Sequence, residues 1–178
     1  MRLFIAVNFN DQVKKRIMDV QELLRCQCLR GNFTRPENLH LTLVFIGEIP
    51  DGMRNLDSLS RIITDVQAAS FFIPFNRTGC FTHSRKELWW IGAEPDAPGL
   101  SLIKDIHEQL LSGLLNEGFP ADARPFNAHI TLGREIKHAK PVILDCPEII
   151  VSVNRVSLMK SEHIHGVLTY TELMGKDL

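Results

Sequence analysis

Hydrophobic and polar residues alternate with two different periods along this 178-residue chain. Apolar residues recur every three or four positions in three stretches. This spacing predicts amphipathic helices from residue 10 or 11 to Gly31, over 52–69 and over 97–117. Extended apolar or alternating runs predict seven strands, over residues 2–9, 39–48, 70–81, 86–94, 129–135, 148–162 and 167–173.

The order of these elements favours an α+β fold over a doubly wound one. Helices and strands alternate irregularly, and several strands follow one another directly, which is typical of mainly antiparallel sheets with flanking helices. No low-complexity stretch or linker separates the two halves of the chain. We therefore expect residues 1–178 to form one domain with two closely packed lobes.

Charge and composition narrow the class of function. The chain has 20 basic and 21 acidic residues, so it lacks the overall positive charge that drives nonspecific nucleic-acid binding. Any contact with nucleic acid should be local. The first residues form neither a signal peptide nor a membrane span, so the sequence predicts a cytoplasmic protein without membrane contact. The four cysteines fit no disulfide framework or zinc motif, and we interpret them as free thiols: Cys26, Cys28, Cys80 and Cys146.

Two predicted strands carry the same short motif, His-x-Thr-Leu, 89 positions apart. The first copy contains His40 and Thr42, and the second contains His129 and Thr131. Residues two apart on a strand point to one face, so each strand offers an imidazole beside a hydroxyl. In the first strand, Leu39, Leu41, Leu43 and Phe45 are expected on the opposite, core-facing side. The repetition suggests that the two halves are loosely equivalent and share a cleft.

Two histidines facing each other across a cleft suit hydrolysis at phosphorus. An imidazole titrates near pH 6.5, so one ring can accept a proton from water while the other donates one to the leaving oxygen. The threonine hydroxyls can donate to the non-bridging oxygens. Such a site needs neither metal nor cofactor. Its activity should peak at or somewhat above the ordinary pKa of histidine, because a bound phosphate favours imidazolium.

Arg134 could add a positive charge that forks onto phosphate oxygens. Strict alternation, however, places Arg134 on the face opposite His129, because the two are five residues apart. Gly133 could mark a bulge that turns Arg134 toward the cleft. Otherwise Arg134 is an ordinary surface charge, and the sequence leaves both interpretations open.

The segments "RPENLHLTLVFIGEI" and "RPFNAHITLGR" resemble the two-histidine (2H) phosphoesterase superfamily, and within it the bacterial and archaeal RNA 2′,3′-cyclic phosphodiesterases, also called 2′–5′ RNA ligases. The resemblance extends to "RLFIAV", "LWWIG" and "LMKSEHIHGVLTYTEL". It implies a two-lobed fold with pseudo-two-fold symmetry around a central cleft. It also implies metal-free hydrolysis of RNA cyclic ends to 2′-phosphomonoesters, with 2′–5′ ligation as the reverse reaction.

The resemblance also implies roles for single residues. His40 would be the proton donor and His129 the acceptor, and Thr42, Thr131 and Arg134 would bind phosphate. Ala128 departs from the proline that many relatives carry before the second histidine. The implied partners are RNA ends or small cyclic-phosphate nucleotides, and we expect a monomer with no obligate protein partner.

The sequence also allows other interpretations. The substrate could be another small cyclic phosphate, or the chain could be a non-catalytic module that binds RNA ends or nucleotides. His163 and His165 could belong to a metal site, but such a site needs three or four ligands, and only Glu162 lies nearby. We interpret His83, His107 and His138 as surface residues. One of Trp89 and Trp90 should pack in the core.

Overall fold

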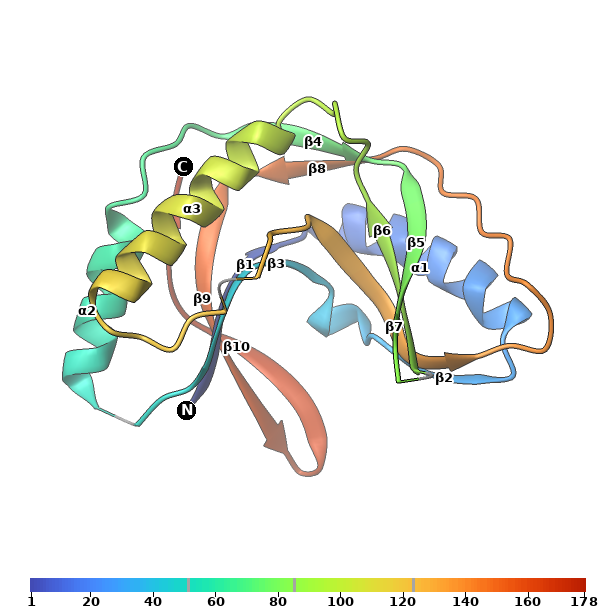
Figure 1. The fold of residues 1–178 in the computed structure, drawn as a ribbon, viewed down its shortest axis with the longest axis horizontal. Helices are drawn as coiled ribbons and strands as arrows, with labels where there is room; N and C mark the ends of the chain where they lie inside the picture. The colour runs from blue at the N-terminus through green and yellow to red at the C-terminus, as the bar shows by residue number, and fades with distance from the viewer. Residues whose placement is uncertain (51, 85, 123) are drawn as a thin grey trace.

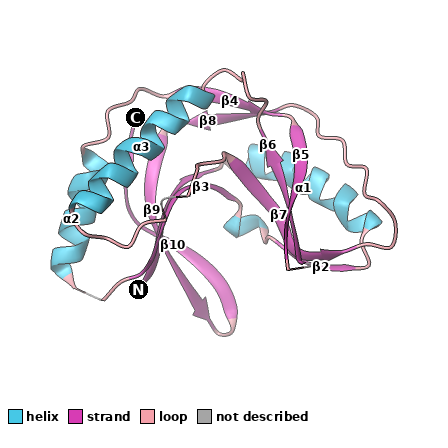
Figure 2. Cartoon of the chain, in the orientation of Figure 1, coloured by secondary structure: helices cyan, strands magenta, loops and turns pink. Residues whose placement is uncertain are grey.

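The computed structural model describes residues 1–50, 52–84, 86–122 and 124–178. Figures 1 and 2 show its helices on the outside of a strongly twisted sheet. The elements in chain order are β1 (Arg2–Asn8), α1 (Asp11–Gln27), β2 (Arg30–Phe33), the 3₁₀ turn η1 (Pro36–Asn38), β3 (His40–Glu48), α2 (Met53–Thr64), β4 (Phe71–Phe75), β5 (Arg77–His83), β6 (Lys86–Gly92), α3 (Leu100–Asn116), β7 (His129–Lys137), β8 (Ile149–Val153), β9 (Arg155–Ile164) and β10 (Val167–Asp177).

The strands form two antiparallel sheets, as the α+β prediction required. The large sheet has the order β10-β9-β1-β3-β7-β6-β5, with β2 also paired to β7, and β4 and β8 form a separate two-stranded sheet. Strands β3 and β7 meet at the centre of the large sheet through the pair Leu41 and Ile130. Beyond this pair the strands diverge, and the sheet opens into two halves (Figure 1). The two-lobed α+β fold is therefore confirmed.

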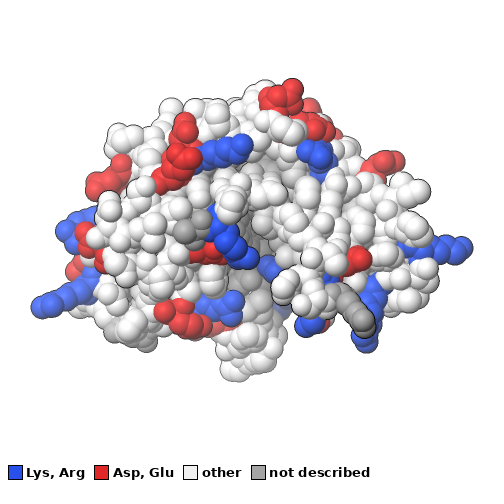
Figure 3. All heavy atoms as spheres, viewed as in Figure 1, with Lys and Arg blue, Asp and Glu red and all other residues white. Residues whose placement is uncertain are grey.

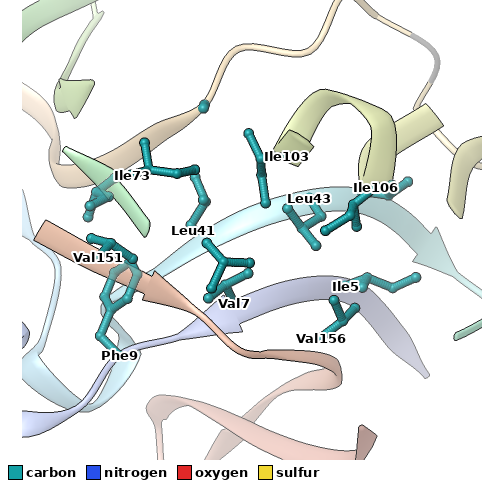
Figure 4. Close-up of a cluster of buried hydrophobic side chains, with 14 of the residues drawn as sticks. Ile5, Val7, Phe9, Leu41, Leu43, Ile73, Ile103, Ile106, Val151 and Val156 are labelled. Carbon is teal, nitrogen blue, oxygen red and sulfur yellow. The ribbon is translucent and has the colours of Figure 1, made fainter. Parts of the chain in front are cut away.

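The helices cover one face of the large sheet. Asn10 caps α1 by accepting a hydrogen bond from the Val13 backbone N–H at 2.9 Å, and the helix then buries a stripe that ends at Leu24. Helix α1 covers the half containing β7, whereas α2 and α3 cover the half containing β3 (Figure 1). Ile103 and Ile106 of α3 pack near Leu43 in one continuous apolar core (Figure 4).

Three details differ from the sequence prediction. The run 70–81 is not one strand, because Asn76 separates β4 of the small sheet from β5 of the large one. Asn154 divides the run 148–162 between β8 and β9 in the same way. Gly31 does not end the first helix, which stops at Gln27. It lies instead in β2, where the Ile136 side chain occupies the space that a Cβ would need.

Candidate active site

The four motif side chains lie together on the face of the sheet opposite the core. Leu41 lies between the histidine and threonine of the first motif, and Ile130 lies between those of the second. The two residues pair with each other across β3 and β7, and both are fully buried. Since neighbouring strand residues point to opposite faces, both histidines and both threonines point away from this buried pair. Figure 3 shows the surface hollowed between the two halves, with Lys and Arg side chains around the hollow.

Both imidazoles are anchored in the same way. The Nδ1 atom of His40 lies 2.7 Å from the Asn38 carbonyl oxygen, and that of His129 lies 2.8 Å from the Asn127 carbonyl oxygen. A carbonyl can only accept, so each Nδ1 carries a proton and donates it. In a neutral ring the Nε2 atom is then left as the acceptor. In His40 this atom lies 2.9 Å from Thr42 Oγ1.

Burial makes both rings less basic than an ordinary histidine. Desolvation lowers the pKa of His40 to about 4; the hydrogen bond to Asn38 opposes the shift, and the charges of Arg134 and His129 add to it. Desolvation also lowers the pKa of His129, and the charge of Arg134 again adds to this shift. In the unliganded protein both rings are therefore neutral at pH 7.

Aromatic side chains cover both histidines. The His40 ring lies 4.9 Å from the Phe4 ring and 5.3 Å, edge-on, from the Tyr170 ring. The His129 ring lies edge-on at 5.3 Å from Phe81, which in turn packs on Trp90 at 5.2 Å. Each half thus places aromatic rings from its own strands beside its own histidine. Trp90 lies on this face, whereas its neighbour Trp89 packs against the core as expected.

A β-bulge turns Arg134 toward the motif side chains. Across β6 and β7, Trp90 lies opposite Thr131, while Leu88 lies opposite Arg134. Leu88 and Trp90 are two apart and share one face of β6, so Thr131 and Arg134 also share a face although they are three apart. The added residue of the bulge lies between Thr131 and Gly133 and is Leu132. The sequence had located a possible bulge at Gly133; the bulge exists, one position earlier.

Strand β3 has the matching irregularity. Phe4 lies opposite Phe45 and Ala6 lies opposite Thr42, so Leu43 is the extra residue and Phe45 points to the same face as Thr42. The predicted placement of Phe45 on the core face was therefore wrong: Phe45 is exposed, and Val44 is buried in its place. The first six residues of β3 and β7 have the same order of buried and exposed positions. Phe45 and Arg134 are thus equivalent positions in the two halves.

Buried polar side chains from the covering helices bind the carbonyl groups at both bulges. The Leu43 carbonyl lies 2.8 Å from Nδ1 of His107 in α3. The Leu132 carbonyl accepts a hydrogen bond at 2.8 Å from Nε2 of Gln21 in α1. Both His107 and Gln21 are 6% exposed. The interpretation of His107 as a surface residue was therefore wrong, although its spacing from Ile103 and Leu110 places it on the apolar stripe of α3.

The remaining candidates do not gather into a site. Within residues 1–50, 52–84, 86–122 and 124–178, no group of three His, Cys, Asp or Glu side chains could hold a metal ion. His163 and His165 lie exposed at the end of the β9–β10 hairpin. Cys26, Cys28, Cys80 and Cys146 are unpaired. Among the same described residues, no helix is both long enough and apolar enough to cross a membrane.

Comparison with known protein families shows which family the chain belongs to. A profile of the 2′–5′ RNA ligase superfamily matches residues 9–164, a range that contains both His-x-Thr motifs. The chain belongs to the 2′–5′ RNA ligase superfamily. The two motif strands, His40–Glu48 and His129–Lys137, therefore lie inside the part that defines this superfamily.

Several superfamily members resemble the chain over most of its length. An RNA 2′,3′-cyclic phosphodiesterase of Archaeoglobus fulgidus is 31% identical over 82% of this chain and 78% of its own length. A protein of the same name from Thermus thermophilus is 31% identical over 99% of this chain and 92% of its own length. A crystal structure of a Thermus thermophilus protein superimposes with a TM-score of 0.84 at 27% identity, covering 100% of this chain and 98% of the other.

Proposed function

We propose that this protein hydrolyses RNA 2′,3′-cyclic phosphodiester ends to 2′-phosphomonoesters by general acid and base catalysis with His40 and His129. Membership of the 2′–5′ RNA ligase superfamily supports this proposal, as do relatives named RNA 2′,3′-cyclic phosphodiesterase. The observation that carries it is the shared anchoring of the two rings. Each donates Nδ1–H to a backbone carbonyl, which leaves Nε2 of each ring for proton transfer on the open face.

The reaction then follows from the protonation states of the two rings. Neutral His129 accepts a proton from water at Nε2, and the water oxygen forms a bond to phosphorus. The bond between phosphorus and the ribose 3′ oxygen breaks, and protonated His40 gives its Nε2 proton to that oxygen. The products are a 2′-phosphomonoester and a 3′ hydroxyl. An RNA 5′ hydroxyl in place of water would give a 2′–5′ linkage, which is the ligase reaction.

The bound phosphate supplies what the free protein lacks. Because burial keeps His40 neutral at pH 7, His40 can act as an acid only if the pKa of its ring rises in the complex. The negative charge of the cyclic phosphodiester favours imidazolium and so raises this pKa. Thr42 and Thr131 lie beside the two rings and would donate hydroxyl groups to the non-bridging oxygens. Arg134 would balance the charge of the phosphate with a forked hydrogen bond.

We further propose that the substrate is an RNA end in the cytoplasm, and that the protein acts as a monomer without a metal or cofactor. The four unpaired thiols fit a reducing compartment. Both proton carriers and all the phosphate-binding groups come from this one chain, so the proposed reaction requires no second subunit. Light scattering during turnover would test the oligomeric state, and cell fractionation would test the compartment.

The decisive experiment uses an RNA oligomer that ends in a 2′,3′-cyclic phosphate. Purified protein in EDTA should convert it to the 2′-phosphomonoester, identified by ³¹P NMR. His40→Ala and His129→Ala should each lose most turnover, since general acid or base catalysis contributes roughly 10²–10⁴-fold. His163→Ala, which changes an exposed histidine, should remain fully active.

Two outcomes would reject the proposal. A product that carries the phosphate at the 3′ position would contradict the assignment of the leaving oxygen. Tight binding of the RNA end with no turnover, unchanged in the two histidine variants, would indicate a binding module instead of an enzyme. Complete loss of turnover in EDTA, restored by a divalent ion, would contradict the metal-free reaction.

A further inference from the structure

A basic cavity continues the proposed active face toward the outer end of β7. Its volume is about 440 Å³, and its lining includes Arg30, Asn32, Ser84, Lys86, Glu135 and Lys137. Three of these side chains are cationic and one is acidic. The whole chain has a net charge of −1, so this local excess of positive charge runs against the overall balance.

The strand register places the cavity on the same face as the motif residues. Lys86 lies two residues before Leu88 on β6, and Leu88 lies opposite Arg134. Asn32 of β2 lies opposite Arg134 on the other side of β7. Asn32 therefore lies beside Arg134, and Lys86 lies beyond it, both on the face that carries Thr131. The cavity therefore continues the proposed active face along β7, past Arg134.

The only acidic side chain described in the lining is already engaged. The Glu135 carboxylate accepts hydrogen bonds from Lys86 Nζ at 2.5 Å and from Asn32 Nδ2 at 3.2 Å. Glu135 has a φ of +55°, a left-handed conformation that non-glycine residues seldom adopt, within a second bulge of β7. By contrast, Arg30 and Lys137 have no carboxylate within 4 Å among the described residues, and both are exposed. The hydrogen bond from Lys86 lowers the pKa of the Glu135 carboxyl group, and Arg30 adds to this shift only through its charge, so Arg30 and Lys137 can both still contact a ligand.

We propose that this cavity binds the phosphodiester backbone of the RNA strand that leads to the cyclic end. The inference rests on the proposed function, and it identifies the substrate as an oligonucleotide and not a mononucleotide. A strand rises roughly 3.3 Å per residue, so Lys137 lies at most about 20 Å along β7 from Thr131. That distance accommodates a few nucleotides. A positively charged groove that follows the backbone is how proteins bind single strands without sequence preference.

The test compares two substrates with the same reacting group. One is an RNA hexamer ending in a 2′,3′-cyclic phosphate, and the other is adenosine 2′,3′-cyclic phosphate. The double variant Arg30→Ala/Lys137→Ala should raise KM for the hexamer about tenfold and leave the mononucleotide within about twofold. Its KM for the hexamer should also depend less on salt, by about 1.4 in log–log slope, because each phosphate contact on a single strand contributes about 0.7.

Two further variants sharpen the test. The control variant Lys15→Ala/Arg54→Ala removes one lysine and one arginine from exposed positions on α1 and α2, which cover the other face of the sheet. It should leave KM unchanged for both substrates. Glu135→Gln removes the acidic charge from the cavity and should act in the opposite direction, lowering KM for the hexamer. A merely structural role of this region would not produce opposite effects from removing a positive and a negative charge.

The outcomes separate this proposal from the proposed function. Equal losses on both substrates, or no loss on either, would overturn the subsite. If the unmodified protein hydrolyses neither substrate, the proposed function fails, and fluorescence anisotropy with a labelled 2′-phosphate-ended hexamer still tests the cavity. Weaker hexamer binding by Arg30→Ala/Lys137→Ala, but not by the control Lys15→Ala/Arg54→Ala, would then support RNA binding in the cavity. If an acidic peptide displaces the labelled hexamer as effectively as unlabelled hexamer does, RNA is not the specific ligand of the cavity.

Discussion

Leu43 and Leu132 are the extra residues of two matching β-bulges, each placed directly after a motif threonine. A bulge shifts the alternation of a strand by one residue. The residue two positions after the bulged leucine, and three after the threonine, therefore points to the same face as the threonine. In β7 that position is Arg134, and in β3 it is Phe45. The same backbone device thus brings a cation to the proposed phosphate site from one half and an aromatic ring from the other.

The hydrogen bonds of Gln21 should stabilise the second bulge. Its Nε2 donates to the carbonyl groups of both Leu132 and Thr34 at 2.8 Å. Gln21→Met keeps a similar shape but leaves buried carbonyl groups with fewer donors, so the free energy of unfolding should fall by about 1–3 kcal/mol. KM for the cyclic substrate should also rise, because the bulge aims Arg134.

The matched control for this variant is Gln12→Met, the same substitution at an exposed position on the same helix. We expect it to leave KM unchanged. Urea denaturation and steady-state kinetics on both proteins give the two readouts. A Gln21→Met protein with lower stability but an unaltered KM would assign Gln21 a structural role only.

Arg134 should contribute more to substrate binding than either threonine. Arg134 can fork two hydrogen bonds and a positive charge onto the anionic phosphate, whereas a threonine hydroxyl can donate only one hydrogen bond, and a hydrogen bond to a charged group contributes about 1.5–3 kcal/mol. Arg134→Ala should therefore raise KM roughly tenfold to a hundredfold, and Thr42→Val only severalfold. Arg134→Lys keeps the charge but not the fork, and should fall between them. If Arg134→Ala leaves KM unchanged, the bulge does not bring this side chain to the phosphate.

The sequence predicted the motif pairs correctly because strand periodicity is local. His40 and Thr42 share a face over a span of two residues, and so do His129 and Thr131, before either bulge intervenes. The bulges could not be predicted in the same way. Residues 43–46 are all apolar, so the pattern gives no sign of where the alternation shifts. The orientation of Arg134 therefore depends on the register of β6 and β7, which the sequence does not specify.

Other differences have similar causes. Strand β2, Arg30–Phe33, has only four residues and no apolar alternation, and at Gly31 the Ile136 side chain occupies the space that a Cβ would need. At Asn76 and Asn154 the chain passes from one sheet to the other, which divides each predicted strand in two. The local pattern of apolar residues does not show this change of sheet. His107 is different, because its spacing from the buried residues of α3 gave a usable signal. Its partner, the Leu43 carbonyl, exists only because of a bulge that the sequence does not reveal.

A change of leaving group should separate the roles of the two histidines. A ribose hydroxyl needs a proton as it leaves, whereas nitrophenolate barely does. His40→Ala should therefore lose much less activity on a p-nitrophenyl phosphodiester than on the cyclic RNA end. His129→Ala should lose activity on both, since water still needs a base. Both variants should fold, because the side chains point away from the core; circular dichroism checks this. The opposite asymmetry would exchange the two roles.

Burial of the two histidines should move the pH optimum for kcat/KM below 6.5. This parameter reflects the free protein, in which the pKa values of His40 and His129 are both lowered. At pH 7, which lies above both lowered pKa values, most molecules have two neutral rings and lack the acid. Lowering the pH creates the form with one protonated ring, until the second ring is protonated as well. The sequence alone suggested an optimum at or above 6.5; the bound phosphate should restore that value only for kcat.

Tyr170 offers a direct test of this explanation. Its ring lies edge-on to His40 at 5.3 Å and helps to exclude water from the imidazole. Tyr170→Ala should expose His40 and raise the pKa of its ring from about 4 toward the ordinary value, so the optimum for kcat/KM should move to higher pH. Tyr170→Phe keeps the ring and should leave the profile unchanged. NMR titration of the His40 Cε1 proton measures the ring itself, whereas the kinetic limbs report values for the two coupled histidines together. A His40 pKa that does not change in Tyr170→Ala would show that the tyrosine ring is not what excludes the water.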